Sequence, residues 1–184
     1  RESLYRFIGP PLHESYEKFY SFSRKQAMQA VSYYREYYEE KGMFENEVYP
    51  GIKQLLRDLT KQGVLCLVAT SKPEIYAKKI LDYYELSNYF YYIAGANMDG
   101  TRTDKAEVIA YALKQIPAEY NNKKVLMVGD RSHDIIGAKK NGIDCAGVLF
   151  GYGSREELEE AGADFVADSV EAVKNIVFSD IARN

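Results

Sequence analysis

The hydrophobic positions change their spacing once along the chain, about a quarter of the way from its start. Before that point they recur at helical intervals, as at Ala27, Val31, Tyr34 and Tyr38. Ser23 is followed three residues later by Gln26, which is the pattern of a capping box at a helix start. We therefore predict that residues 1–47 form a small unit made of helices alone.

From Val48 onward, short apolar runs alternate with amphipathic segments. Val64–Ala69 is continuously apolar, as expected for a strand buried on both faces of a parallel sheet. Repeated strand–helix units predict an α/β fold with a Rossmann-like open parallel sheet over residues 48–184. The other expected strands are 90–94, 125–128, 145–150 and 164–166, and the expected helices are near 52–59, 73–84, 104–113, 135–140 and 170–178. Ser154 with Glu157 indicates the start of one more helix.

Composition narrows the class of protein. Hydrophobic residues make up 46% of the 184 residues and charged residues 28%, with a formal net charge of −3, so neither a disordered chain nor a broadly basic nucleic-acid binder is expected. No run approaches about 18 apolar residues, so no membrane span is expected. Cys66 and Cys145 lie in apolar runs and indicate buried thiols in a reducing compartment. We expect a cytoplasmic protein, monomeric or weakly homodimeric.

Polar residues gather where the predicted strands end. Thr70 and Ser71 follow the strand 64–69, Asp130 and Asp134 follow the strand 125–128, and Lys105 opens the helix after the strand 90–94. In open parallel sheets, ligands bind beyond the carboxyl ends of the strands. These side chains are therefore expected at one edge of the sheet.

The residue types suit phosphate chemistry. A threonine hydroxyl can donate to a phosphate oxygen, a lysine supplies a point positive charge, and two aspartates suit Mg²⁺. Each residue alone also has a structural explanation: a turn former at Thr70, a solvated lysine at Lys105, and a turn residue and helix cap at Asp130 and Asp134. Their order along the chain favours a phosphoryl-transfer site.

The segments LVATSK, TDKAEVI and LMVGDRSHDI resemble the second, third and fourth motifs of the haloacid-dehalogenase superfamily of phosphatases. FIGPPLHESY and VYPGIKQLL resemble its phosphoglycolate phosphatase-like branch, which includes 5′-nucleotidases. The resemblance covers essentially the whole chain and implies a helical cap over residues 1–47 and an α/β core over 48–184.

The resemblance also implies roles for single residues. Thr70 and Lys105 would be catalytic, and both would bind the substrate phosphate together with Ser71. Asp130 would be a Mg²⁺ ligand, and Asp134 would support the metal directly or through water.

One motif of the family is absent. The first motif, DxDGT, carries the nucleophilic and the acid/base aspartates, and the 184 residues contain only the fragment Asp99-Gly100-Thr101, which we interpret as a turn. We expect the missing motif upstream of Arg1, on a strand that the family places between Val64–Ala69 and Val125–Val128. The cap would then be incomplete at its start, and the core would lack its first strand.

The predicted function is Mg²⁺-dependent hydrolysis of a small-molecule phosphate monoester through an aspartyl-phosphate intermediate. Phosphoglycolate phosphatase-like and 5′-nucleotidase-like activities both fit. Two alternatives remain open: a non-catalytic phosphate-binding or regulatory module, and a phosphotransferase such as a sugar phosphomutase, in which a hydroxyl group replaces water as acceptor.

Overall fold

A computed structural model describes Phe7 and residues 12–181, with the backbone alone for the last two. The chain divides into two compact units, Arg1–Glu47 and Val48–Asn184. No described helix is both long enough and apolar enough to cross a membrane.

The first unit is helical where it is described. It contains α1 (Leu12–Tyr20), α2 (Arg24–Glu40) and the short 3-10 helix η2 (Gly42–Phe44). The predicted capping box is confirmed, since the Ser23 side chain accepts from the Gln26 amide and the Gln26 side chain accepts from the Ser23 amide. Ala27 and Val31 are buried as the spacing predicts, whereas Tyr34 is 38% exposed.

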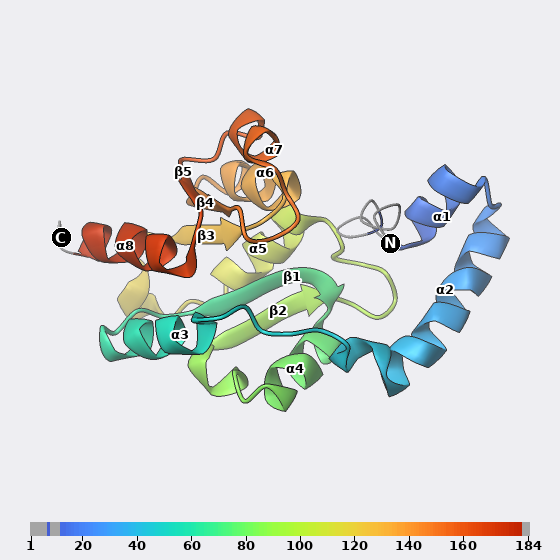
Figure 1. The fold of residues 1–184 in the computed structure, drawn as a ribbon, viewed down its shortest axis with the longest axis horizontal. Coiled ribbons are helices and arrows are strands. Elements are labelled where there is room, and N and C mark those ends of the chain that lie inside the picture. The colour runs from blue at the N-terminus through green and yellow to red at the C-terminus, as the bar shows by residue number, and fades with distance from the viewer. Residues whose placement is uncertain (1–6, 8–11, 182–184) are drawn as a thin grey trace. The chain divides into compact units, whose positions relative to one another are not determined.

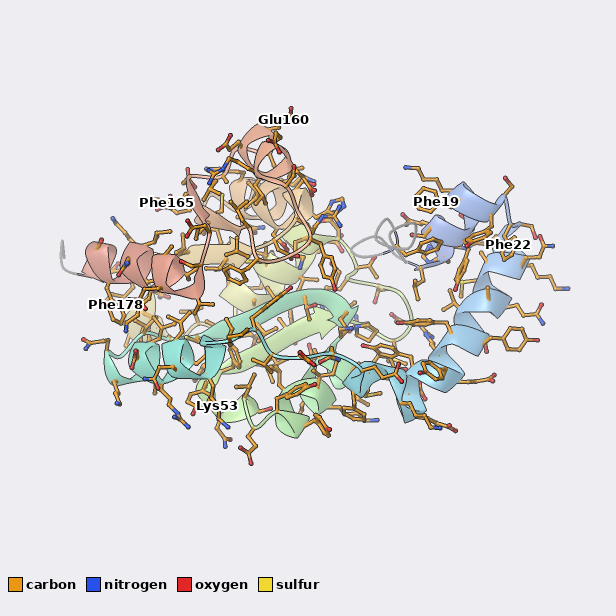
Figure 2. All side chains as sticks on the ribbon, viewed as in Figure 1. Phe19, Phe22, Lys53, Glu160, Phe165 and Phe178 are labelled. Carbon is orange, nitrogen blue, oxygen red and sulfur yellow. The ribbon has the colours of Figure 1, made fainter. Side chains whose placement is uncertain are left out.

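Aromatic rings cluster around α1. Tyr16 stacks on Phe22 with ring centroids 6.0 Å apart, and Phe7 lies 5.4 Å from Phe19. Figure 2 labels Phe19 on α1 and Phe22 in the turn before α2. Because aromatic pairs at these separations add to area burial, the cluster helps to hold this short helix in place.

The second unit alternates helices and strands as predicted (Figure 1). Every strand pair among the described residues is parallel. The α/β fold class is therefore confirmed. Its elements are α3 (Ile52–Lys61), β1 (Leu67–Pro73), α4 (Glu74–Tyr83), η3 (Ser87–Tyr89), β2 (Tyr92–Ala96), α5 (Lys105–Leu113), η4 (Ala118–Tyr120), β3 (Leu126–Gly129), α6 (Ser132–Lys140), β4 (Asp144–Val148), α7 (Arg155–Glu160), β5 (Phe165–Ala167) and α8 (Val170–Ile181).

The strands form two separate sheets in the described part of the chain. One sheet pairs β1 with β2, and the other has the order β3-β4-β5. The buried residues of the strands lie on β2, β4 and β5, while every residue of β1 is partly or fully exposed and Val128 of β3 is 40% exposed. The two strands that the sequence marks as interior are thus the less buried ones, and each has one side without a strand partner among these residues.

Three apolar clusters hold the second unit together. Leu55 and Leu59 of α3 meet Val173 of α8 and the ends of β4 and β5, while Val108 and Ala112 of α5 pack over β1 and β2. The third cluster joins α6, α7 and β4. Of the two cysteines, which are both free, Cys145 is buried in the third cluster and Cys66 is half-buried beside the first.

Candidate functional site

Lys105 stands between the two sheets. Its ammonium Nζ lies 2.9 Å from Oδ1 of Asp134, a residue of α6, the helix that follows β3 in the chain. Nζ also donates a hydrogen bond to the Ala69 carbonyl of β1 at 3.2 Å. Asp104 caps α5 by accepting from the Ala106 and Glu107 amides, which fixes the helix start where Lys105 sits. A Cβ at Gly137 would lie 3.0 Å from Lys105 Cγ, so a glycine there leaves room for the lysine stem.

Asp134 is buried, and its hydrogen bonds are made within the protein. Only 6% of the residue is exposed. Oδ1 pairs with Lys105, while Oδ2 accepts from the amides of Asp130 at 3.1 Å and Arg131 at 3.2 Å. A Cβ at Gly129 would come within 3.0 Å of the Asp134 side chain, so the end of β3 needs glycine to admit this carboxylate. Asp134 thereby ties Lys105 to the backbone that carries Asp130.

Asp130 points toward the loop that follows β4. Its Oδ2 accepts a hydrogen bond from the Tyr152 amide at 2.9 Å. Oδ1 makes no further hydrogen bond to the residues that the structure describes. One oxygen of this carboxylate is therefore held by the protein, and the other remains open to a cation or a water molecule.

Glu157 of α7 holds the turn after Asp130. Its Oε1 accepts from Arg131 Nε at 2.9 Å and from the Ser132 amide at 2.8 Å. Partial burial acts to raise the pKa of Glu157, but the hydrogen bonds from Ser132 and Arg131 outweigh burial and keep that pKa below its ordinary value. Ser154 caps α7 as expected, since its hydroxyl accepts from the Glu157 amide.

Thr70 and Ser71 lie in an irregular end of β1 and not just beyond the strand as predicted. The register passes from Ala69 opposite Ala94 to Pro73 opposite Ala96, so three residues of β1 face Gly95 alone. The Thr70 hydroxyl accepts from the Lys72 amide at 3.1 Å, which leaves its own hydrogen free to donate. Bulges of this kind redirect side chains at the ends of strands.

The carboxylates fit one type of metal site. Within the described residues, no three His, Cys, Asp or Glu side chains gather as a metal-binding group. Mg²⁺ usually takes one or two carboxylates and completes its shell with water and substrate oxygens. Asp130, with one oxygen held and the other open, suits that role, whereas both oxygens of Asp134 are already engaged.

A second ionic cluster fixes the segment before Lys105. Arg102 Nε donates to the Gly95 carbonyl at 2.7 Å, and its Nη2 lies 3.1 Å from Glu74 Oε2. The guanidinium sits 3.7 Å from the ring centre of Tyr111, whose hydroxyl is 2.8 Å from that of Tyr92. The fragment Asp99-Gly100-Thr101 just ahead is the turn that the sequence predicts, with Asp99 accepting from both the amide and the hydroxyl of Thr101.

The tyrosine pair in this cluster predicts an alkaline effect. The hydrogen bond with Tyr111, assisted by burial, raises the pKa of Tyr92 to about 12. A raised folded-state pKa gives stability that is complete below pH 10 and is lost as the pH rises toward 12. We expect Tyr92→Phe to cost about 1 kcal/mol at pH 8. Urea unfolding at several pH values should show this difference shrinking above pH 10, and a constant difference would contradict the assignment.

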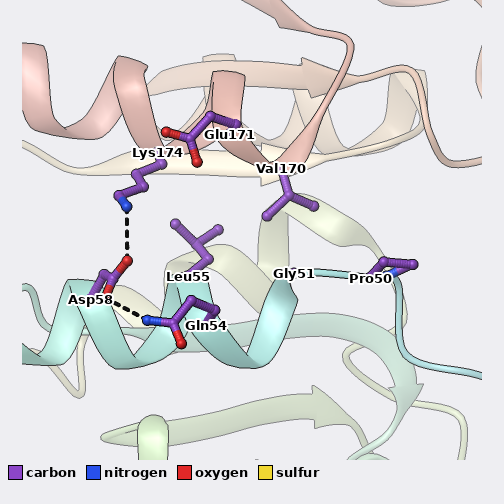
Figure 3. A pocket seen from close by; sticks show the side chains of 8 residues that line it. All are labelled: Pro50, Gly51, Gln54, Leu55, Asp58, Val170, Glu171 and Lys174. Carbon is purple, nitrogen blue, oxygen red and sulfur yellow. Dashed lines mark hydrogen bonds and ion pairs between the residues drawn. The ribbon is translucent and has the colours of Figure 1, made fainter.

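A hollow of about 390 Å³ lies between α3 and α8. Figure 3 shows Lys174 and Asp58 pointing toward each other across it. Lys174 and Asp58 form an ion pair at 2.8 Å, and the Gln54 side chain donates a hydrogen bond to Asp58. None of its lining residues belongs to the set around Lys105, so the hollow is separate from the candidate site.

The sequence identified the chemical groups of the site but missed their supports. Lys105, Asp134 and Asp130 are brought together as expected, and Thr70 directly follows the carbonyl that Lys105 contacts. The sequence analysis assigned no role in the site to Gly151, Gly153 or Glu157. The position of the two glycines directly after a predicted strand was a usable signal, because that strand ends at the same sheet edge.

Comparison with known proteins agrees with the motifs. A family model described as haloacid dehalogenase-like hydrolase matches residues 1–148. A 5′-nucleotidase of Pseudomonas aeruginosa is 42% identical over 157 residues, which make up 84% of this chain and 69% of that protein. The tyrosine-protein kinase PtkA of Mycobacterium tuberculosis is 39% identical over 160 residues, or 86% of this chain, but the chain spans only 53% of that relative's length.

A solved structure extends the likeness to three dimensions. The crystal structure of a protein from Clostridium acetobutylicum, described as a predicted phosphatase, superposes with a TM-score of 0.88 at 42% sequence identity. The match covers 97% of this chain and 82% of that one.

Proposed function

Because the chain belongs to the haloacid dehalogenase-like hydrolase family, we propose that it carries most of the active site of a Mg²⁺-dependent phosphatase acting on small-molecule phosphate monoesters. The observation that carries the proposal is the position of Lys105. Its ammonium lies between the ends of β1 and β3, in contact with the Ala69 carbonyl and Asp134. A fixed cation at that place is what a transferring phosphoryl group requires.

The described residues take separate roles in this proposal. Thr70 donates its hydroxyl hydrogen to a phosphate oxygen, with Ser71 beside it in the same bulge. Lys105 balances negative charge on the phosphate. Asp130 holds Mg²⁺ through its open oxygen, and Asp134 keeps Lys105 in place and is not itself a ligand. When bound, Mg²⁺ would neutralise charge on the phosphate oxygens.

The nucleophile is proposed to come from a strand outside the 184 residues. The gap between β1 and β3 supports this, because in the described part of the chain β1 pairs only with β2 and β3 only with β4, and neither β1 nor β3 is buried like β2 or β4. An aspartate on that strand would attack phosphorus and form an acyl phosphate while the bond to the leaving oxygen breaks. A second aspartate would protonate the leaving oxygen and then deprotonate the water that releases inorganic phosphate.

We propose nucleoside 5′-monophosphates as the first substrates to test, on the basis of the relative named 5′-nucleotidase. The helical unit, Arg1–Glu47, is proposed as the cap that selects among esters. Release of inorganic phosphate from a panel of nucleotides, phosphoglycolate and sugar phosphates would rank the substrates. Transfer to a sugar hydroxyl without phosphate release would instead indicate a phosphotransferase.

The metal assignment predicts a specific loss. In the full-length protein, Asp130→Asn should weaken Mg²⁺ binding by about 10- to 100-fold and reduce turnover at low Mg²⁺, because the substitution removes the open carboxylate oxygen. Isothermal titration with MgCl₂ and phosphate-release assays would measure both effects. Asp168→Asn, at an exposed position of the same unit, is the matched control. Unchanged Mg²⁺ affinity in the Asp130 variant would remove Asp130 from the site.

A further inference from the structure

We propose, on the basis of the function proposed above, that Gly151–Glu157 is a positioning clamp for Asp130. The clamp has two parts: a Gly-x-Gly turn that holds the Asp130 carboxylate, and a glutamate that holds the backbone after it. The segment follows β4 and includes the start of α7, so it reaches Asp130 from a neighbouring strand of the same sheet.

The first part of the clamp is a main-chain hydrogen bond. The Tyr152 amide donates to Asp130 Oδ2 at 2.9 Å. With Oδ2 fixed, the rotation of the carboxylate is restricted and Oδ1 has a defined direction. A carboxylate held in this way favours ligation of a metal ion through one oxygen, and such supporting bonds tune metal affinity.

The two glycines are needed because of close approach. A Cβ at Gly151 would come within 3.0 Å of the Asp130 side chain, and a Cβ at Gly153 would come within 3.0 Å of the Asp130 carbonyl oxygen. Neither glycine has a positive φ, whereas Gly142 and Gly162 do. Glycine is therefore required at these two positions because of the close contact with Asp130 and not because of backbone conformation.

The second part of the clamp is Glu157. Its Oε1 accepts from both the Arg131 side chain and the Ser132 amide, the two residues that follow Asp130. A carboxylate in this place also faces the N-terminal end of α6, where the helix dipole favours negative charge. Ser154 caps α7 by accepting from the Glu157 amide, which links the turn directly to the glutamate.

The clamp acts through Asp130, so loss of the clamp should appear in Mg²⁺ binding more than in folding. We expect Gly151→Ala and Glu157→Met to weaken Mg²⁺ binding about 10-fold or more, as is usual when support of a metal ligand is lost. Methionine removes the oxygen that accepts from Arg131 and Ser132. Turnover should fall at low Mg²⁺ and recover at saturating Mg²⁺, which a general structural defect would not do.

The test uses the full-length protein and MgCl₂ as the probe. Isothermal titration gives the Mg²⁺ dissociation constant, thermal unfolding gives stability, and phosphate release is measured across Mg²⁺ concentrations. Glu156→Met is the control for Glu157→Met, because Glu156 is exposed in the same helical turn. Gly142→Ala is the control for Gly151→Ala, since a Cβ at Gly142 meets nothing within 4 Å but is strained by a φ of +67°.

The outcomes separate the clamp from the proposed function. If Asp130→Asn weakens Mg²⁺ binding and both clamp variants weaken it while the controls do not, the clamp is supported. If Asp130→Asn weakens binding and the clamp variants bind Mg²⁺ like the wild type, the clamp is overturned and the proposed function stands. If Asp130→Asn has no effect, the metal assignment itself fails. Should Gly151→Ala not fold, Glu157→Met decides the matter, because it keeps the side chain close to its original length without the acceptor oxygens.

Discussion

Replacing Lys105 by methionine is expected to reduce phosphatase turnover of the full-length protein by about 10²- to 10³-fold, since it removes the cation aimed at the transferring phosphoryl group. The same substitution leaves Asp134 as a buried carboxylate without its partner. Lys105 and Asp134 side chains are 17% and 8% exposed, so breaking the pair should also cost about 3–5 kcal/mol of stability.

A second variant separates these two effects. In Lys105→Met/Asp134→Asn the buried charge is gone, while the amide oxygen can still accept from the Asp130 and Arg131 amides. Much of the stability should return, but turnover should stay low. Urea unfolding and phosphate-release kinetics on the single and double variants provide the comparison. Recovery of activity together with stability would show that Lys105 serves folding alone.

The 184 residues expressed by themselves are expected to be inactive and poorly soluble. Among the residues that the structure describes, β1 and β3 each present an unpaired edge, and Val128 on β3 is 40% exposed although it lies in an apolar run. Unpaired strand edges promote association between chains, and each backbone group buried without a partner costs about 1–3 kcal/mol. A strand between β1 and β3 would pair with both edges, which would prevent their association with other chains and satisfy their backbone groups. The same strand would bring the nucleophile beside Lys105.

This prediction is tested by comparing residues 1–184 with the same residues preceded by their native upstream sequence. Size-exclusion chromatography measures association, and hydrolysis of p-nitrophenyl phosphate with Mg²⁺ measures activity. The longer protein should be soluble and active. A monomeric and active 184-residue product would place the nucleophile within these residues, and the motif assignment would then be wrong.

The sequence determined the class of fold because the pattern of apolar positions is local. Burial on both faces requires a continuous apolar run, and burial on one helical face requires apolar residues every three to four positions. Helix starts were also readable, at Ser23, Asp104 and Ser154, because a cap is a contact between residues three apart. Strand limits were less exact: β1 begins at Leu67 and not Val64, and continues through Thr70 to Pro73.

The chemical groups of the candidate site were readable for a related reason. Thr70, Lys105, Asp130 and Asp134 each stand at a strand end or a helix start, and the topology of parallel strands brings such positions to one edge. The sequence by itself therefore named the groups that could handle a phosphate.

Only the tertiary structure indicates which of these groups positions another and which remains open to a ligand. By sequence, Asp134 was expected to support the metal directly or through water. Its Oδ1 pairs with Lys105 and its Oδ2 accepts from two amides, which supports the proposal that Asp134 positions Lys105. The supports of Asp130 come from residues more than twenty positions away, at Tyr152 and Glu157, and no local pattern marks their contacts with the segment that carries Asp130. Contacts between segments distant in the sequence depend on packing in three dimensions, and packing leaves no periodic trace in the chain.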